Sequence, residues 1–194
     1  MARPTKFDRQ TVLQGAIEAF RDAGYCATRM PDLVQATQLQ PGSLYAAFES
    51  KQGLLEASLE QYAQHGIARI KATISASASP LSGVKAVLKG VVEESIIDKK
   101  GCLLVNTLLE LSQTDSAIRQ RIIDYLAEIE TQLRVTLQLA QQNGEVSAEK
   151  DLDALAKFLM VNMWGFKVMA KTGASDENIR AALQILLDSL SGSL

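Results

Sequence analysis

Cys102 is the side chain in this sequence best placed to react with a small molecule. It follows the basic residues Lys99 and Lys100 and precedes an apolar segment, so it stands at the start of a predicted helix. The partial positive charge of a helix N-terminus and two nearby ammonium groups both stabilise a thiolate. Thiolates react with electrophiles and oxidants, which makes Cys102 a candidate redox sensor. The alternative is a buried, inert cysteine that packs as a small hydrophobe. The second cysteine, Cys26, we expect to pack beside a turn.

The residue patterns typical of enzyme active sites are absent from the sequence. His65 is the only histidine, so a cluster of histidines that binds a metal is not available. There is no Gly-rich phosphate loop and no nucleophile motif. The Glu-x-x-His pairs that hold metals in helical bundles are also missing. We therefore expect no enzymatic activity, no metal and no cofactor.

Residues 24–55 contain three helix starts within about thirty positions. Thr28 is the predicted N-cap of the first of them, and it must cap through the N–H of Met30 because Pro31 has none. Pro41 opens the next helix at the first helical position, where proline is favoured. Two short helices joined by so tight a turn form a helix-turn-helix, and the second helix of that motif can enter a DNA major groove.

Helical patterns continue through the rest of the chain. Only four prolines occur and β-branched alternation is scarce, which indicates an all-α fold. The predicted helices follow Asp8, Thr28, Gln40 and Ser50, cover residues 81–98 and 102–112, follow Thr114 or Asp115, run from Ser147 to about Thr172, and follow Ser175. A stretch rich in serine and alanine, residues 75–83, interrupts the helices and marks a joint.

These residues resemble the TetR family of bacterial transcriptional regulators. The matching residues are Gly24-Tyr25, Thr28, Leu33-Val34, Pro41-Gly42-Ser43-Leu44-Tyr45, Phe48 and Ser50-Lys51. The similarity covers about residues 7–58, and the count of nine helices also fits. It implies a three-helix DNA-binding domain over residues 1–50. It also implies a helical effector-binding and dimerisation domain over residues 51–194.

The resemblance further implies contacts with a double-stranded, palindromic DNA operator. Gln40 and Ser43 would reach base edges in the major groove, and Tyr45 would touch a phosphate or a thymine methyl. The residues implied to hold the DNA backbone are Thr28, Arg29 and Lys51. The whole implied contact set is Thr28, Arg29, Gln40, Pro41, Gly42, Ser43, Tyr45 and Lys51.

Two departures from the family pattern bear on DNA affinity. Gln38 stands where the family usually has glycine, and a non-glycine residue with positive φ is strained. Gln40 replaces the usual small N-cap. In addition, no Lys or Arg lies between Arg29 and Lys51. We therefore expect a modest electrostatic contribution to DNA binding and a shallow salt dependence.

The net charge of −2 argues against non-specific coating of nucleic acid. Residues 1–52 nevertheless hold six Lys or Arg against five Asp or Glu. Arg3 and Lys6 form a basic arm that could reach a neighbouring groove or phosphates. This weak asymmetry suits DNA contact at the N-terminal end.

The last two predicted helices are apolar enough to pair with a second copy of the chain. One helix-turn-helix covers only a few base pairs, so specific affinity requires two copies related by a two-fold axis. Residues 158–170 are apolar on nearly every side, which also fits an ordinary buried helix. We expect a homodimer formed through these two helices.

The middle of the chain contains candidates for binding an unknown small-molecule effector. A few polar groups among apolar residues are typical of such a site, although the same residues also fit plain core. The candidates are Tyr62, Cys102, Asn106, Tyr125, Asn162 and Trp164. The sequence around Cys102 and the later Ala170-Lys171 is similar to an electrophile-responsive subgroup of the family, which includes the N-ethylmaleimide reductase repressor. That likeness implies that Lys171 could approach Cys102 and lower its pKa.

Composition places the chain among cytoplasmic proteins. No apolar run reaches the length of a membrane span. The first nine residues are polar and basic and are not followed by an apolar segment, which is not the pattern of a secretory signal. Two distant cysteines fit unpaired thiols in a reducing compartment. The sequence thus predicts a DNA-binding regulator, most simply a repressor released by a small molecule or an electrophile. The alternative is a helical small-molecule-binding protein or enzyme that does not bind DNA.

Overall fold

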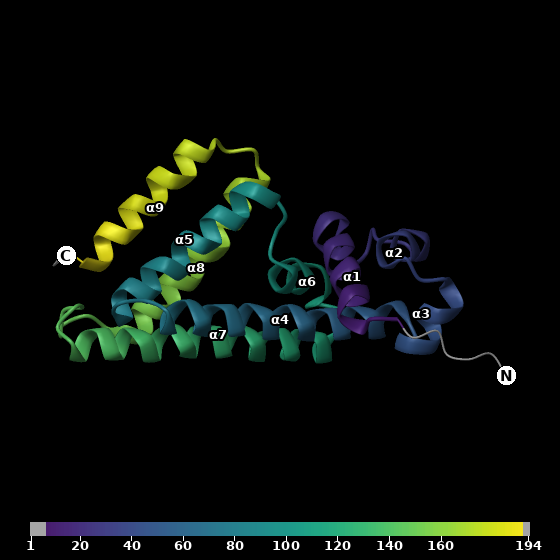
Figure 1. Cartoon of the computed structure of the whole chain (residues 1–194), viewed down its shortest axis with the longest axis horizontal. Helices are drawn as coiled ribbons and strands as arrows, with labels where there is room; N and C mark the ends of the chain where they lie inside the picture. The colour runs from purple at the N-terminus through teal and green to yellow at the C-terminus, as the bar shows by residue number, and fades with distance from the viewer. Residues whose placement is uncertain (1–6, 192–194) are drawn as a thin grey trace. The chain divides into compact units, whose positions relative to one another are not determined.

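The computed structural model describes residues 7–191, and within them the chain is helical with no β-strand. The predicted all-α fold with nine helices is confirmed over these residues (Figure 1). The helices are α1 Arg9–Ala23, α2 Met30–Thr37, α3 Pro41–Phe48, α4 Lys51–Ser75, α5 Pro80–Asp98, α6 Leu103–Leu111, α7 Ser116–Gln142, α8 Leu152–Lys171 and α9 Asp176–Ser191. No helix in the described part of the chain is long and apolar enough to cross a membrane.

The chain divides into two compact units. The first unit comprises Met1–His65 and Leu103–Ile122, and the second comprises Gly66–Cys102 and Ile123–Leu194. Helices α4 and α7 therefore each contribute residues to both units. The predicted boundary between residues 50 and 51 remains a prediction, because this division follows contacts and not the function of each part.

The first unit is built on the close packing of α1 and α2. Val12, Leu13, Ala16, Ile17 and Phe20 give α1 a buried apolar stripe at helical spacing. Gly15 lets α2 approach this helix, since a Cβ at that position would lie 2.3 Å from the carbonyl oxygen of Ala36. Leu33, Leu44 and Phe48 complete the core beneath α2 and α3. The apolar residues of the two short helices thus fix their mutual position.

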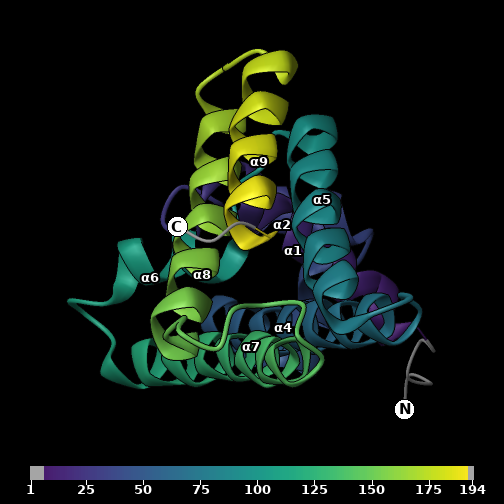
Figure 2. The same ribbon diagram turned by 90° about the vertical axis from the view of Figure 1, so that its left-hand side faces the viewer.

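The second unit has its core between α5, α8 and α9. Figures 1 and 2 both show α9 lying beside α5 and α8, and all three helices contact one another. Their fully buried side chains include Val84, Leu88, Leu159 and Ile179. At the start of α5, Ser79 caps the helix by accepting a hydrogen bond from the Ser82 N–H at 3.3 Å.

Most predicted helix caps are confirmed. The Asp8 carboxylate accepts the N–H of Gln10, and Ser50 Oγ accepts the N–H of Gly53. Asp115 accepts the N–H of Ile118, and Ser175 accepts the N–H of Asn178. In each case a short polar side chain reaches an N–H of the first helical turn that has no intrahelical partner.

Two predicted helix starts are wrong. The N-cap of α2 is Arg29 and not Thr28, because the Asp32 carboxylate accepts the Arg29 N–H at 2.7 Å and sets the first turn one residue later. Helix α8 starts at Leu152 and not at Ser147. The Asp151 carboxylate accepts the N–H groups of both Asp153 and Ala154, so it supplies the stronger cap.

Candidate nucleic-acid interface and ligand-binding unit

Helices α2 and α3 are joined by three residues, of which Gln38 sets the direction of the chain. Gln38 has φ 57° and ψ 22°, the left-handed conformation that glycine adopts without strain. Its side-chain amide donates to the Gln35 carbonyl at 2.6 Å, which is one of the carbonyls left free at the end of α2. The sequence departure at Gln38 therefore leaves the turn intact, and this hydrogen bond offsets part of the strain.

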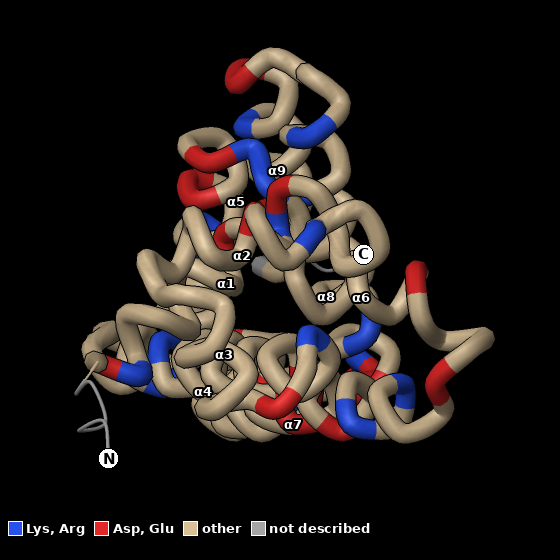
Figure 3. The backbone as a smooth tube through the Cα atoms, turned by 90° about the vertical axis from the view of Figure 1, so that its right-hand side faces the viewer, with Lys and Arg blue, Asp and Glu red and all other residues tan. Residues whose placement is uncertain are grey.

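Helix α3 presents a polar, uncharged surface at its N-terminal end. Gln40 is exposed, its side chain makes no capping hydrogen bond, and Pro41 occupies the first turn. Ser43 is half-buried and Tyr45 is 49% exposed, whereas Leu44 between them is buried. The helix carries no Lys, Arg, Asp or Glu, and its tube in Figure 3 shows no charged position. Amides and hydroxyls are thus the groups that α3 offers to a partner.

Gly42 lies in the first turn of α3 with open space around it. A Cβ built there meets no described atom within 4 Å. The free fold therefore gives no steric reason for glycine at this position. The absence of a side chain allows another molecule to approach the helix backbone closely.

Arg29 and Lys51, the two cations predicted to contact the DNA backbone, are held in different ways. Arg29 is exposed at the start of α2. Lys51 is half-buried, and its Nζ lies 4.3 Å from the centre of the Tyr25 ring. This cation–π contact keeps the ammonium beside the turn between α1 and α2. Arg3 and Lys6 lie outside the described residues.

The Thr28 side chain is buried in the turn between α1 and α2. It is 1% exposed, and its hydroxyl donates to the Gly24 carbonyl at 2.5 Å. This hydroxyl closes the turn between α1 and α2, because it satisfies a carbonyl that follows the end of α1. The predicted contact of Thr28 with the DNA backbone stays a prediction.

The turn between α1 and α2 is held from α6 by a carboxylate. Glu110 accepts the backbone N–H of Tyr25 at 3.2 Å and that of Cys26 at 2.8 Å. The expected packing of Cys26 is wrong, because its side chain is exposed. Desolvation, and next the hydrogen bond and charge of Glu110, raise the pKa of the Cys26 thiol, whereas Lys51 lowers it. Sequence reasoning did not single out Glu110, whose partners are more than eighty positions away.

The predicted effector residues are divided between the two units. Tyr62 and Asn106 belong to the first unit, where the Arg21 guanidinium lies 5.7 Å from the Tyr62 ring centre. Cys102, Tyr125, Asn162 and Trp164 belong to the second unit. The Asn162 amide donates to the Phe158 carbonyl of its own helix, and Trp164 packs on the apolar core. All six side chains are half-buried, and their role in ligand binding stays a prediction.

Cys102 immediately precedes α6, as the sequence predicts for a thiol at a helix N-terminus. Its thiol is free and half-buried. Lys171 is exposed at the last position of α8. Their predicted pairing stays a prediction.

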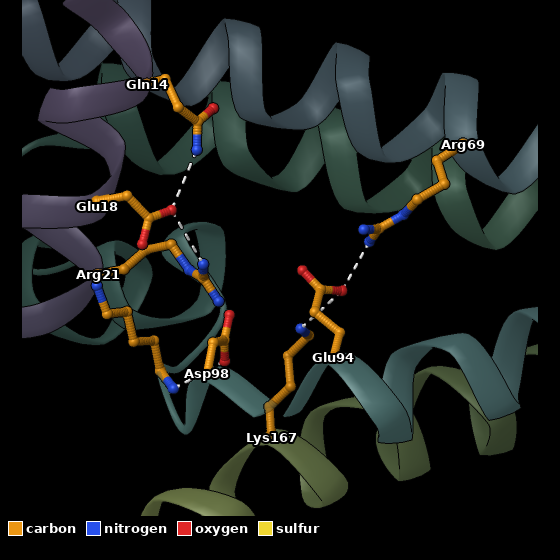
Figure 4. Close-up of polar contacts among 8 residues, drawn as sticks. Gln14, Glu18, Arg21, Arg69, Glu94, Asp98 and Lys167 are labelled. Carbon is orange, nitrogen blue, oxygen red and sulfur yellow. Dashed lines mark hydrogen bonds and ion pairs between the residues drawn. The ribbon is translucent and has the colours of Figure 1, made fainter. Parts of the chain in front are cut away.

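Lys167 on α8 is a candidate site residue that sequence reasoning missed. It is 8% exposed, and its Nζ has no hydrogen-bond partner among the described residues. Figure 4 shows it facing Glu94 of α5, whose Oε2 lies 3.7 Å from Nζ. The signal in the sequence is that Lys167 is the one charged residue within the apolar stretch 158–170.

Helices α8 and α9 also carry exposed apolar side chains. Phe158, Val161 and Val168 of α8 are 48–60% exposed, and Ile185 of α9 is 73% exposed. Gly165 is exposed on α8, and a Cβ there would meet no described atom within 4 Å. Such a patch is typical of a surface that a protein partner covers.

The described part of the chain contains no group of three or more His, Cys, Asp or Glu side chains that could hold a metal ion. The chemistry available to the two units is therefore hydrogen bonding, charge, apolar contact and the two thiols.

Two descriptions of one protein family match the chain. Residues 12–58 match the family description "Bacterial regulatory proteins, tetR family". Residues 80–186, more than half of the chain, match "Tetracyclin repressor-like, C-terminal domain".

Curated relatives match over most of their length. The chain is 31% identical over 180 residues to the HTH-type transcriptional repressor ComR of Escherichia coli (strain K12), which covers 91% of this chain and 86% of ComR. It is 29% identical over 170 residues to the transcriptional regulator AcuR of Cereibacter sphaeroides, over 84% of this chain and 75% of AcuR.

A solved structure is similar over nearly the whole chain. It is a cysteine mutant of the TetR family transcriptional regulator CifR complexed with 26bp double-strand operator DNA. The TM-score is 0.86 at 28% identity, over 97% of this chain and 100% of CifR. The relatives found are transcriptional regulators and not enzymes. With both family descriptions matched and ComR similar over nine-tenths of this chain, the protein belongs to the TetR family of bacterial regulatory proteins.

Proposed function

We propose that the protein is a cytoplasmic, homodimeric transcriptional repressor that binds a palindromic DNA operator and is released from it by a small-molecule effector. The observation that carries the proposal is the exposed, uncharged polar end of α3, which a left-handed Gln38 turn holds against α2. The second helix of such a motif enters the DNA major groove. ComR is a repressor by name, and CifR was solved with operator DNA, which supports the same role here.

Base recognition would rest on amide and hydroxyl groups. The Gln40 amide can donate to and accept from an adenine edge, and Ser43 can pair with several bases. Tyr45 is exposed enough to reach a thymine methyl or a phosphate. Pro41 and Gly42 would lie at the groove with the backbone of the first turn, where Gly42 leaves room for close approach.

Phosphate contacts would come from Arg29 and Lys51. Arg29 is exposed at the start of α2, and Lys51 is held on the Tyr25 ring beside the turn between α1 and α2. No Lys or Arg lies between Arg29 and Lys51, so the electrostatic contribution per subunit should be modest and log affinity should fall gently with log salt concentration. Specificity would then depend largely on the base contacts of α3.

Dimerisation would use the exposed apolar residues of α8 and α9. Phe158, Val161 and Val168 occupy helical spacing on α8, and Gly165 between them leaves room for a second helix to pack closely. Two copies related by a two-fold axis present two α3 helices, and this symmetry is what a palindromic operator requires.

Effector binding would occur in the second unit and act through α4. This helix runs from Lys51, directly after the helix-turn-helix, to Ser75 in the second unit. An effector releases DNA only to the extent that it binds the DNA-free arrangement more tightly. Cys102 is the candidate for an electrophilic effector, with Lys171 as the group proposed to promote its thiolate.

The decisive experiment is selection of bound duplexes from a random pool, followed by gel-shift titration. We expect a palindromic consensus, and we expect Val161→Glu to give a folded monomer that no longer retards the selected duplex. Arg119→Glu, a charge change at an exposed position of α7, is the matched control and should leave dimerisation intact. Recovery of unrelated sequences at moderate salt would refute the proposal.

A further inference from the structure

Lys167 is a buried ammonium group whose hydrogen bonds are not made within the described chain. The residue is 8% exposed, and Nζ is buried without a hydrogen-bond partner. An ammonium group has three donors, and a buried charge destabilises a fold unless it is paired and hydrogen-bonded. The Lys167 ammonium therefore needs an anion that accepts its hydrogen bonds.

Glu94 does not accept a hydrogen bond from Lys167. Its Oε2 lies 3.7 Å from Lys167 Nζ, within ion-pair range but too far for a hydrogen bond. The same oxygen accepts from Arg69 Nη2 at 2.8 Å, so Arg69 on α4 is its hydrogen-bonding partner (Figure 4). Glu94 can therefore remain satisfied while Lys167 binds another carboxylate.

We infer that Lys167 Nζ binds the carboxylate of a small organic acid that acts as the effector. This inference rests on the proposed function, which requires an effector in the second unit. The ammonium would donate to the ligand oxygens the hydrogen bonds that it lacks in the free protein. Glu94 would keep its contact with Arg69.

The charges of this cluster indicate a ligand with one negative charge. Lys167 and Arg69 contribute two positive charges and Glu94 one negative charge, which leaves a balance of +1. A monocarboxylate neutralises that balance, whereas a dianion would leave an excess of negative charge beside Glu94.

The surroundings of Lys167 indicate that the rest of the ligand is apolar. Met163 and Ala170 lie one turn away on either side of Lys167, and Val91 lies one turn before Glu94. All three belong to the buried apolar core of the second unit. A short aliphatic or aromatic acid can place its carboxylate on Nζ and its body against such side chains.

The inference is tested by thermal unfolding of the full-length protein with acids and their matched amides. The probes are sodium acetate, butyrate, hexanoate and benzoate at equal ionic strength, each beside its amide. We expect at least one acid to raise Tm by about 5 °C or more at saturation and to weaken operator binding. The matched amide should do neither.

Lys167→Met removes the charge and keeps the volume of the side chain. We expect it to weaken the response to the acid at least tenfold and to raise the Tm of the free protein by about 2 to 4 °C, because an unfilled buried charge is gone. Lys167→Arg should keep the preference for acid over amide. The matched control is Lys157→Met, an exposed lysine of the same helix, which should respond as the wild type does.

The inference is overturned if no acid exceeds its amide, or if Lys167→Met responds like the wild type. Selective binding of a duplex by the ligand-free wild type separates the two proposals. If that binding is present and no acid acts, only the inference fails. If the acid response depends on Lys167 and no duplex is preferred, the carboxylate site at Lys167 stands and the proposed function fails.

Discussion

The carboxylate of Glu110 on α6 accepts the backbone N–H of Cys26 at 2.8 Å, in the turn that leads into the helix-turn-helix. It also accepts the N–H of Tyr25, so both N–H groups of this turn are held by one side chain. Helix α6 begins directly after Cys102, at the junction with the second unit. A displacement of α6 would therefore act on the turn before α2 through two hydrogen bonds.

Glu110→Ala removes both acceptors and leaves the Tyr25 and Cys26 N–H groups to solvent. Hydrogen bonds to a charged group contribute about 1.5 to 3 kcal/mol when shielded, and these are partly exposed, so we expect a loss of about 1 to 3 kcal/mol in total. Chemical denaturation measures the free energy of unfolding, and hydrogen exchange should be faster at both amides. Exposed Gln113→Ala on the following turn is the control, and equal effects from the two changes would contradict the assignment.

Gly24→Ala should disturb the same turn for two separable reasons. Gly24 has φ +85°, where alanine is strained, and a Cβ there would lie 2.5 Å from Glu110 Oε1. We expect a loss of about 1 to 2 kcal/mol. Because removal of Glu110 also removes the close contact, the double variant Gly24→Ala/Glu110→Ala should lose less than the sum of the single changes. Gly66→Ala, at a helical position with open space, should instead stabilise by up to about 1 kcal/mol.

Gly42→Ala separates folding from DNA binding. Alanine has a higher helix propensity and meets no atom in the free chain, so the variant should unfold at the wild-type temperature or slightly above it. If α3 lies in the major groove as proposed, the added methyl group should weaken operator binding about tenfold or more. Calorimetry and gel-shift titration of one preparation provide both readouts, and unchanged DNA affinity would place Gly42 outside the interface.

The Cys26 thiol should alkylate slowly although it is exposed. Desolvation and Glu110 raise its pKa above the ordinary value of 9.0, so the thiolate fraction at neutral pH is small. In a Cys102→Ser background, the rate with iodoacetamide should rise with pH through a midpoint above 9.0. Glu110→Gln should lower that midpoint and Lys51→Met should raise it. Mass spectrometry of the labelled protein measures each rate, and a midpoint below that of free cysteine would be inconsistent with the geometry.

Glu145 should give the second unit a stability that depends on pH. Its pKa is lowered from 4.5, first by the hydrogen bond from Ser79 Oγ at 2.6 Å and further by Asn143 and the Leu81 N–H. As the pH falls, a carboxyl whose pKa is lower in the folded state takes up its proton in the unfolded state first. Its contribution to the free energy of unfolding is therefore complete above about pH 4.5 and is lost as the pH falls through the folded pKa.

Glu145→Gln is therefore expected to be less stable than the wild type near neutral pH, with the difference shrinking as the pH falls below 4.5. Urea unfolding from about pH 7 to about pH 3 measures this difference. Ser79→Ala should lose the same pH dependence in part, because the largest cause of the shift is then absent. If the difference in free energy of unfolding between Glu145→Gln and the wild type stays constant over this pH range, the assigned role of Glu145 is wrong.

Local sequence patterns were enough to predict the helices and the motif. Asp8, Ser50 and Asp115 act over three positions, and the apolar stripe of α1 repeats every three to four residues, so neighbouring residues contain the information. Where two capping signals compete locally, as Thr28 does with Arg29 and Asp32, the hydrogen bonds of the folded turn decided the start of the helix.

The side chains that surround the proposed sites could not be placed in the same way. Burial of Thr28, exposure of Cys26 and the contact of Glu110 with the Tyr25 turn all depend on how α1, α2 and α6 pack. The partners lie far apart in the chain, and no local periodicity encodes them.

The sequence by itself determined an all-α regulator with a helix-turn-helix, because helix propensity, capping and turn chemistry operate between near neighbours. The tertiary structure alone decided that Lys167 is buried with its donors unfilled, since Glu94 on α5 is held by Arg69 on α4. Whether a charge is paired or left available depends on distances among three helices, and those distances exist only after the core has packed.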